Sequence, residues 1–246
     1  MRRISSGSHY KSTIGMAVAL STLIILLALP RTLFAQDWAN SITYPADSTP
    51  FGMTYGDWQA AYLQYFFSIP ASINPVADTT GANCKVAQSS GPVFFLNSAL
   101  PGSFVTRTCT VSTSKALLVT VAWSECSNLE VPPSYGGNPQ DMRTCAAAST
   151  DGVGVNTLKL RVDKNNISEV LRRMRVQSPS YDFIMPATDN ILGLNGVTSG
   201  SSVSDGYLVM LEPLSPGNHV IHFEGAFVSG PACCGSFGVT YNLTVQ

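Results

Sequence analysis

Six cysteines constrain the fold of this chain more than any other feature of its sequence. They are an even number in 246 residues, and even counts are typical of exported proteins whose disulfides form in an oxidising compartment. Their order along the chain favours two local bridges, Cys84–Cys109 and Cys126–Cys145. A zinc site is the weaker alternative, because the spacing of cysteine and histidine that zinc usually needs is absent.

The adjacent Cys233 and Cys234 are a separate question. Two neighbouring cysteines can close a small ring, stay as two thiols or link two molecules. Gly230, Pro231 and Gly235 surround them, which predicts a surface turn. No helix N-terminus or basic neighbour is present to lower a thiol pKa. The sequence therefore favours a structural role for the pair over a redox role.

The first 35 residues have the pattern of a secretory signal peptide. Arg2, Arg3 and Lys11 supply a positive region, an apolar run covers 14–29, and Ala35 is a small residue of the kind that precedes cleavage. The run is shorter than the roughly 20 residues that span a bilayer. We therefore predict an exported protein, periplasmic or extracellular, with no stable membrane span after cleavage; an uncleaved anchor is the alternative.

The expected mature chain, residues 36–246, is long enough for a single domain with a substantial core. Removing residues 1–35 takes away four of the fourteen basic residues and none of the fifteen acidic ones, so the mature chain is mildly acidic. Nucleic acid and anionic membranes both need basic surface, so we expect neither as a partner. Only 12% of the residues are charged, a low value that is common in secreted β-sandwiches.

Residues 107–126 are expected to form the central hairpin of the fold. The β-rich runs 104–112 and 116–123 are joined by a small polar turn, and a cysteine lies near each end. Further short strands with turn signals between them continue along the chain, and no repeat or linker divides it. We predict a mostly β protein, a single antiparallel β-sandwich that is jelly-roll-like.

An N-terminal amphipathic helix is predicted to accompany the strands. Thr54 and Asp57 form a capping box, aromatic residues follow at helical spacing from Trp58 to Phe66, and Pro70 stops the helix. This aromatic stripe favours packing against a sheet. The alternative is an exposed face that stacks on sugars or contacts a membrane, so Trp58 stays a candidate binding residue.

A second, short helix is predicted from Asn138, with Pro139 at its first position and an acidic residue in its first turn. It would carry Cys145 back towards Cys126. The predicted architecture is thus a sandwich with an amphipathic helix and a disulfide-tied helix.

His222 and Glu224 are the clearest candidates for chemistry. Side chains alternate along a strand, so these two would share a face and could bind a ligand or act as a base–carboxylate pair. Arg175 belongs to a basic run that could bind an anion or lie on a solvated face. We take His222, Glu224, Arg175 and Trp58 as candidate binding residues, and we predict no metal and no cofactor.

Motifs for catalysis give little support for an enzyme. An S-x-x-K match at 112–115 lies in a polar turn, whereas that serine should begin a buried helix. No P-loop or Rossmann glycine pattern is present. Paired carboxylates are harder to exclude, because glycosidases show no local motif. The candidate acids are Glu125, Asp205, Glu212 and Glu224.

Several stretches, spread over nearly the whole expected mature chain, carry a resemblance: GDW at 56–58, SIP at 68–70, DTTGANC at 78–84, RTCTV at 107–111, SDGYLVMLEPLSPGNHVIHF at 204–223 and YNLTV at 241–245. In them the chain resembles an uncharacterised family of secreted bacterial proteins. The resemblance implies a signal peptide and a mostly β fold, and it transfers no catalytic residue. It also implies that Cys233–Cys234 is peculiar to this chain. Members usually carry more tryptophan in the first helix, which weakens the sugar-stacking interpretation there.

The function predicted from these features is that of a secreted or periplasmic, non-enzymatic β-sandwich module. Its partner would be a ligand or an envelope component, with a glycan as one candidate. The alternatives are a carbohydrate-active hydrolase that uses paired carboxylates, such as Glu125 and Glu224, and a purely structural surface protein.

Overall fold

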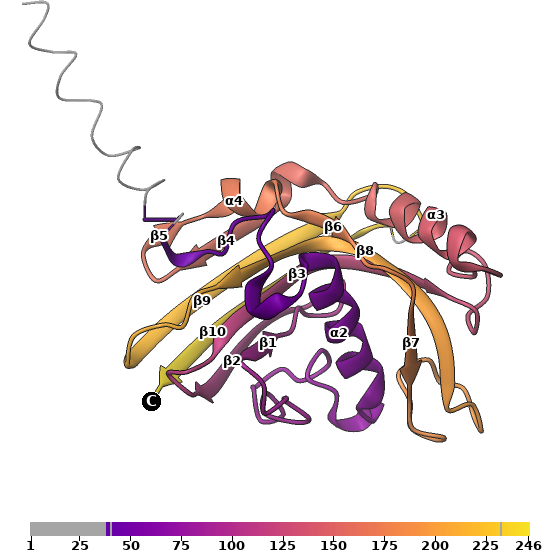
Figure 1. Cartoon of the computed structure of the whole chain (residues 1–246), viewed down its shortest axis with the longest axis horizontal. Helices are drawn as coiled ribbons and strands as arrows, with labels where there is room; N and C mark the ends of the chain where they lie inside the picture. Colours follow the sequence, from indigo (N-terminus) through magenta and orange to yellow (C-terminus); the bar gives the residue numbers. More distant parts are fainter. Residues whose placement is uncertain (1–37, 40, 232) are drawn as a thin grey trace, which may run out of the picture.

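The computed structural model describes residues 38–39, 41–231 and 233–246, and the predicted signal peptide lies outside these residues. Two five-stranded sheets form the body of the fold (Figure 1). We call the sheet with the order β1-β3-β8-β6, in which β7 also pairs with β8, sheet A. Its strands are β1 (Val93–Leu96), β3 (Ala116–Ser127), β6 (Arg175–Gln177), β7 (Tyr181–Ile184) and β8 (Ser199–Leu211).

The other sheet, sheet B, has the order β2-β10-β9-β4-β5. Its strands are β2 (Phe104–Val111), β4 (Lys159–Val162), β5 (Asn165–Asn166), β9 (Gly217–Phe227) and β10 (Gly235–Val245). The helices are α2 (Tyr55–Ser68), α3 (Pro139–Thr150) and α4 (Ser168–Arg172), with short 3-10 turns η2 (Pro50–Gly52), η3 (Ala71–Ile73) and η4 (Val155–Thr157). None of the helices in the described part of the chain is long and apolar enough to cross a membrane.

Both sheets are mixed, which corrects the prediction of a single antiparallel sandwich. β1 lies parallel to β3, and β2 lies parallel to β10, whereas the remaining pairs are antiparallel. The mostly β class is confirmed. The parallel pairs escaped prediction because alternation and turn residues report a strand and its faces, and they do not report which distant strand becomes its partner.

The predicted hairpin over 107–126 is also wrong. Its two runs are strands β2 and β3, but they belong to different sheets, and the turn at 112–115 carries the chain from one sheet to the other. The physical reason lies in burial. β2 alternates between exposed and buried residues, as a strand with one solvated face does, whereas β3 is buried on both faces. A strand of the second kind belongs in the middle of a covered sheet.

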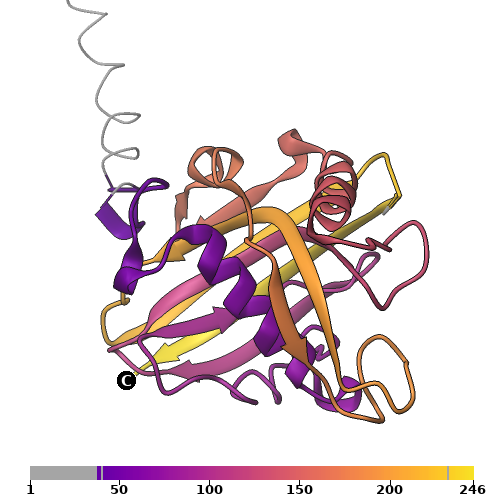
Figure 2. The ribbon, with the colours of Figure 1, turned by 45° about the vertical axis from the view of Figure 1, so that its right-hand side comes forward.

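The predicted N-terminal helix is confirmed as α2. The Thr54 hydroxyl accepts a hydrogen bond from the backbone N–H of Asp57, and the Asp57 carboxylate accepts one from the backbone N–H of Thr54 at 3.0 Å. The strands β7 and β8 curve around the helix (Figure 2). The ring of Phe67 stacks on Phe183 with centroids 4.1 Å apart. The aromatic stripe is therefore part of the core.

The two disulfides predicted from the order of the cysteines are confirmed. Cys84–Cys109 ties an irregular loop to β2, and Cys126–Cys145 ties α3 to β3. Asn138 caps α3 as predicted, because its side chain accepts hydrogen bonds from the first backbone N–H groups. The structure also resolves the open question at 233–234, where the two cysteines form a disulfide with each other.

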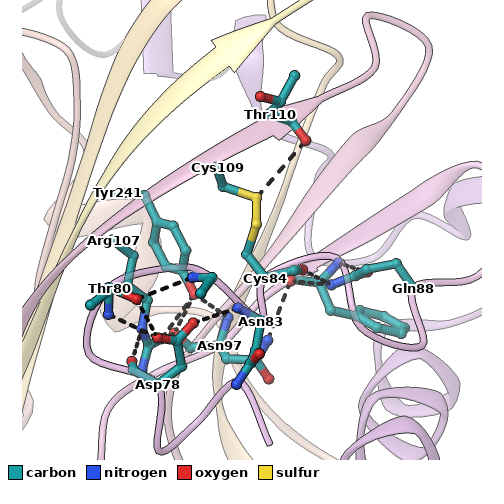
Figure 3. The surroundings of a disulfide bond; sticks show 12 residues. Asp78, Thr80, Asn83, Cys84, Gln88, Asn97, Arg107, Cys109, Thr110 and Tyr241 are labelled. Carbon is teal, nitrogen blue, oxygen red and sulfur yellow. Dashed lines mark hydrogen bonds between the residues drawn. A yellow bond between two sulfur atoms is a disulfide. The ribbon is translucent and has the colours of Figure 1, made fainter. Parts of the chain in front are cut away.

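A buried arginine holds the loop that the first disulfide anchors (Figure 3). The Arg107 side chain is 1% exposed, and its guanidinium lies over the ring of Tyr241. It donates hydrogen bonds of 2.6–3.2 Å to the carbonyl oxygens of Val76, Asp78, Asn97 and Ser98 and to the Tyr241 hydroxyl. The four carbonyl acceptors come from the loops before and after β1, so one cation fixes the path of the backbone on both sides of that strand.

Candidate functional site

The outer face of sheet B brings together polar side chains from three strands. His222 on β9 lies opposite Thr240 on β10, and Glu224 lies opposite Lys159 on β4. Inward residues of β9 such as Phe223 are fully buried, which leaves the alternate positions on the outside. The structure thus places His222 and Glu224 on one face, as the alternation along the strand predicts.

Hydrogen bonds join these residues into one network. The Nε2 atom of His222 lies 3.1 Å from Glu224 Oε2, and its Nδ1 atom lies 3.0 Å from Thr240 Oγ1. Lys159 Nζ donates to Glu224 Oε1 at 2.5 Å. The hydrogen bond from Lys159, with a smaller one from His222, lowers the pKa of the Glu224 carboxyl below its ordinary value. This carboxylate is therefore ionised and fixed in orientation at neutral pH.

An exposed aromatic ring adjoins this network. The Phe104 side chain is 62% exposed at the start of β2, opposite Gly238 on β10. A Cβ atom on Gly238 would lie 2.8 Å from Phe104 Cδ1, so the ring occupies space that any larger residue would take. Phe104, Lys159 and Glu224 line the same cavity of about 280 Å³, together with Asn156. The sequence alone did not indicate Phe104 as a site residue, because its surroundings depend on the distant strand β10.

Hydroxyl and amide groups continue across the same face. Thr106, Thr108 and Thr110 occupy the outward positions of β2, and they lie in register with Thr240, Asn242 and Thr244 of β10. These six side chains are exposed or half-buried. The cavity beside Phe104 therefore opens onto a surface that can both donate and accept hydrogen bonds. We call Phe104, Lys159, His222, Glu224 and Thr240 the sheet B site.

The candidate Arg175 lies elsewhere. It is on β6 in sheet A, where its guanidinium donates to the carboxylates of Asp205 and Asp151, both at 2.7 Å. A further hydrogen bond of 3.1 Å reaches the carbonyl oxygen of Ala147 in α3. These contacts tie β6, β8 and α3 together. The structure therefore does not bring Arg175 to His222 and Glu224.

Trp58 lies in the core. Its side chain is 7% exposed, its Nε1 donates to the carbonyl oxygen of Pro50 at 2.9 Å, and its ring packs edge-on against Phe51 and Phe95. The ring has no free face for a sugar. We therefore leave Trp58 out of the candidate site.

Among the candidate acids, the structure does not pair Glu125 with Glu224. Glu125 is on β3 in sheet A and accepts a hydrogen bond from Ser202, whereas Glu224 is on the outer face of sheet B. Burial raises the pKa of Glu125 well above its ordinary range, and the neighbouring Glu130 raises it further. Glu130 was not among the acids that the sequence indicated as candidates. Asp205 is paired with Arg175 instead of with another acid.

A larger cavity, of about 570 Å³, lies between residues 43–46 and the segment around α4. Of the described residues that line it, Arg173 is charged and most of the others are apolar, as with Val170 and Met174. It therefore offers fewer groups for recognising a polar ligand than the sheet B site does.

Comparisons with known proteins give no family for this chain. No family model matches it, and no curated protein matches it. A crystal structure of a cysteine protease inhibitor, EhICP2, from Entamoeba histolytica is 12% identical over 63% of this chain and 96% of that chain, at a TM-score of 0.22. The solution structure of amebosin is 12% identical over 60% of this chain and 100% of that chain, at 0.19. Similarity this low supports no conclusion about fold or function.

Proposed function

We propose that this protein is a secreted or periplasmic, non-enzymatic module that binds a glycan at the sheet B site. The observation that carries the proposal is the exposed ring of Phe104, which lies over Gly238 and beside the Lys159–Glu224–His222 network. An exposed large aromatic residue next to fixed hydrogen-bonding groups is the usual composition of a small-ligand site.

The chemistry of a sugar matches both parts of this site. One face of a pyranose ring carries C–H groups, which pack against an aromatic ring, and its edge carries hydroxyl groups that donate and accept hydrogen bonds. The Glu224 carboxylate accepts such bonds, Lys159 donates them, and the Thr240 hydroxyl does both. Because the charges of Lys159 and Glu224 offset each other, the site favours a neutral, polyhydroxylated ligand over a strong anion.

The rows of threonine side chains on β2 and β10 favour a polymeric ligand. They extend along β2 and β10 away from Phe104, so a chain of sugars could follow the strands while one residue of it occupies the cavity. The three disulfides support the exported location, since such bonds form in oxidising compartments. We therefore expect the ligand among the polysaccharides of an envelope or extracellular matrix.

A glycan array followed by calorimetry tests the proposal. We expect the wild-type protein to bind one class of neutral glycan, and Phe104→Ala to weaken that affinity about tenfold or more, which corresponds to about 1.4 kcal/mol. Ile184→Ala is the matched control, because it removes another large, exposed apolar side chain, from β7 in sheet A. Glycan binding that is unchanged in Phe104→Ala, or no binding to the array and to an envelope polysaccharide extract, would overturn the proposal.

A further inference from the structure

A row of hydroxyl groups crosses the face of sheet A against which α2 packs. Ser127 on β3 lies directly opposite Ser202 on β8, and Ser202 lies directly opposite Tyr181 on β7. Directly opposed residues of antiparallel strands point to the same face, with Cβ atoms roughly 5 Å apart. Three hydroxyl-bearing side chains from three strands are therefore next to one another.

Two carboxyl groups lie over this row. Ser202 Oγ donates to Glu125 Oε2 at 2.6 Å, and Ser127 Oγ donates to Glu130 Oε2 at 3.0 Å. Because the two serines are neighbours across the strands, the two carboxyl groups share one small space. We call Glu125, Glu130, Ser127, Ser202 and Tyr181 the carboxylate cluster.

The cluster lacks a positive partner. Within the described part of the chain, no lysine, arginine or histidine forms an ion pair with Glu125 or Glu130, whereas Glu224 and Asp205 each have at least one such partner. Two carboxylates side by side in a largely buried setting cost free energy unless a positive charge joins them.

Two further oxygen atoms are buried nearby without a partner. The Tyr181 side chain is 6% exposed and stands in the hydroxyl row, yet its hydroxyl forms no hydrogen bond with the described residues. Gln59 of α2 is 1% exposed, and its amide nitrogen donates to Ser204, which lies directly opposite Glu125. The Oε1 atom of Gln59 likewise has no hydrogen-bond partner among the residues that the structure describes. Buried polar atoms without partners are rare and mark places where a water or an ion belongs.

We propose that the carboxylate cluster binds a Ca²⁺ ion. The groups around the space are carboxylate, hydroxyl and amide oxygens, which are the ligands that Ca²⁺ prefers, and nitrogen and sulfur ligands for zinc or copper are absent from the cluster. One Ca²⁺ ion offsets the charge of Glu125 and Glu130 together. The remaining ligands would be neutral oxygens of the protein or water.

The affinity and the route of entry follow from the same geometry. The described residues contain no group of three or more acidic, histidine or cysteine side chains arranged to hold a metal, so only two charged ligands are available. Few charged ligands give the weak binding of extracellular modules, with Kd on the order of 0.1–1 mM. Glu125 also lines an open cleft of about 230 Å³ beside Trp123, through which the ion can enter. The site is in sheet A and does not depend on glycan binding at the sheet B site.

Calorimetric titration of the chelator-treated protein with CaCl₂ tests the proposal. We expect one Ca²⁺ per molecule and a Tm that rises by several degrees in millimolar Ca²⁺. Glu125→Gln and Glu130→Gln should each weaken binding at least tenfold, because each removes one of two charged ligands. Glu169→Gln is the matched control, since Glu169 is an exposed glutamate on α4. No binding heat and no change of Tm up to 10 mM Ca²⁺ would overturn the proposal, as would full binding by either cluster variant.

Terbium luminescence of the wild-type protein is a second test of the Ca²⁺ site and needs no variant. Tb³⁺ takes the same oxygen ligands as Ca²⁺, and its luminescence is sensitised by a nearby tyrosine or tryptophan. With Tyr181 in the cluster and Trp123 lining the adjoining cleft, bound Tb³⁺ should emit on excitation at about 280 nm and lose that emission as Ca²⁺ displaces it. Absence of sensitised emission, or emission that Ca²⁺ does not displace, contradicts a cation site here.

Discussion

Two buried charged centres in this protein differ in how their charge is balanced. Arg107 is on β2 and reaches the loops around β1, and five oxygen atoms of the protein accept its hydrogen bonds. Glu125 and Glu130 each have one serine hydroxyl as partner, and among the described residues neither has a cation. The first centre is complete within the chain, whereas the proposed Ca²⁺ would complete the second. A buried charge with all its partners indicates a structural role, and one without them indicates a site.

The same comparison explains why the two centres respond in opposite ways to loss of charge. Removing Arg107 leaves carbonyl oxygens buried without donors, and each unsatisfied group costs free energy. Removing one negative charge from the carboxylate cluster relieves a repulsion between like charges.

Arg107→Met should lower the free energy of unfolding by about 3–5 kcal/mol, the range seen when one partner of a buried charged network is removed. Urea unfolding followed by circular dichroism measures the change. Arg161→Met is the control, because Arg161 is exposed on β4 and should stay within about 0.5 kcal/mol of wild type. A loss below about 1 kcal/mol for Arg107→Met would show that Arg107 does not hold the loops on the two sides of β1.

Glu130→Gln should stabilise the Ca²⁺-free protein at neutral pH by about 1 kcal/mol or more, since two like charges about 4 Å apart repel by that much even in bulk water. Burial first, and the neighbouring Glu130 second, raise the folded-state pKa of Glu125 above its ordinary 4.5, and Tyr181 and Ser202 are its other close neighbours. The contribution of protonated Glu125 to the free energy of unfolding is therefore fully present below about pH 4.5 and is lost as the pH rises.

Unfolding in chelator-containing buffer between pH 4 and pH 8 is the measurement for this prediction. The decline with rising pH should be smaller in Glu130→Gln than in wild type, and Glu169→Gln should follow the wild-type curve. Equal declines in wild type and Glu130→Gln would show that the two carboxyl groups do not interact.

Glu224→Gln should have the smallest effect, below about 1 kcal/mol, because its ion pair with Lys159 is partly exposed and screened by solvent. Its folded-state pKa is lowered from the ordinary 4.5, so its contribution is present above that pH and is lost as the pH falls. The variant should match wild type in acid and be slightly less stable at pH 7. A larger difference in stability between variant and wild type at pH 4 than at pH 7 would show that the ionised Glu224 carboxylate does not stabilise the fold.

Features that depend on neighbours in sequence were predictable. The capping box at Thr54 and Asp57 gave the start of α2, and alternation along a strand placed His222 and Glu224 on one face. The order of the cysteines gave two of the disulfides. Each of these features depends on a spacing of a few residues or on the closure of a short loop, and both can be read from the sequence.

Features that depend on strand partners were not predictable. The neighbour of Phe104 is Gly238, and Glu130 reaches Glu125 only through two serines on different strands. The supposed hairpin failed for the same reason, since two adjacent β runs do not say whether they pair with each other. Both proposed sites therefore became visible only once the pairing of the strands was known.

The parallel pairing of β2 with β10 has a consequence for the order in which the two sheets form during synthesis. β2 precedes almost all of the other strands, yet its partner is β10, which follows them. Until β10 has been synthesised, β2 is an unpaired edge, open to association with other chains. The ring of Phe104 gains its place over Gly238 only when β10 arrives. On the proposed function, glycan binding is therefore acquired last, after all the strands of sheet A have been made.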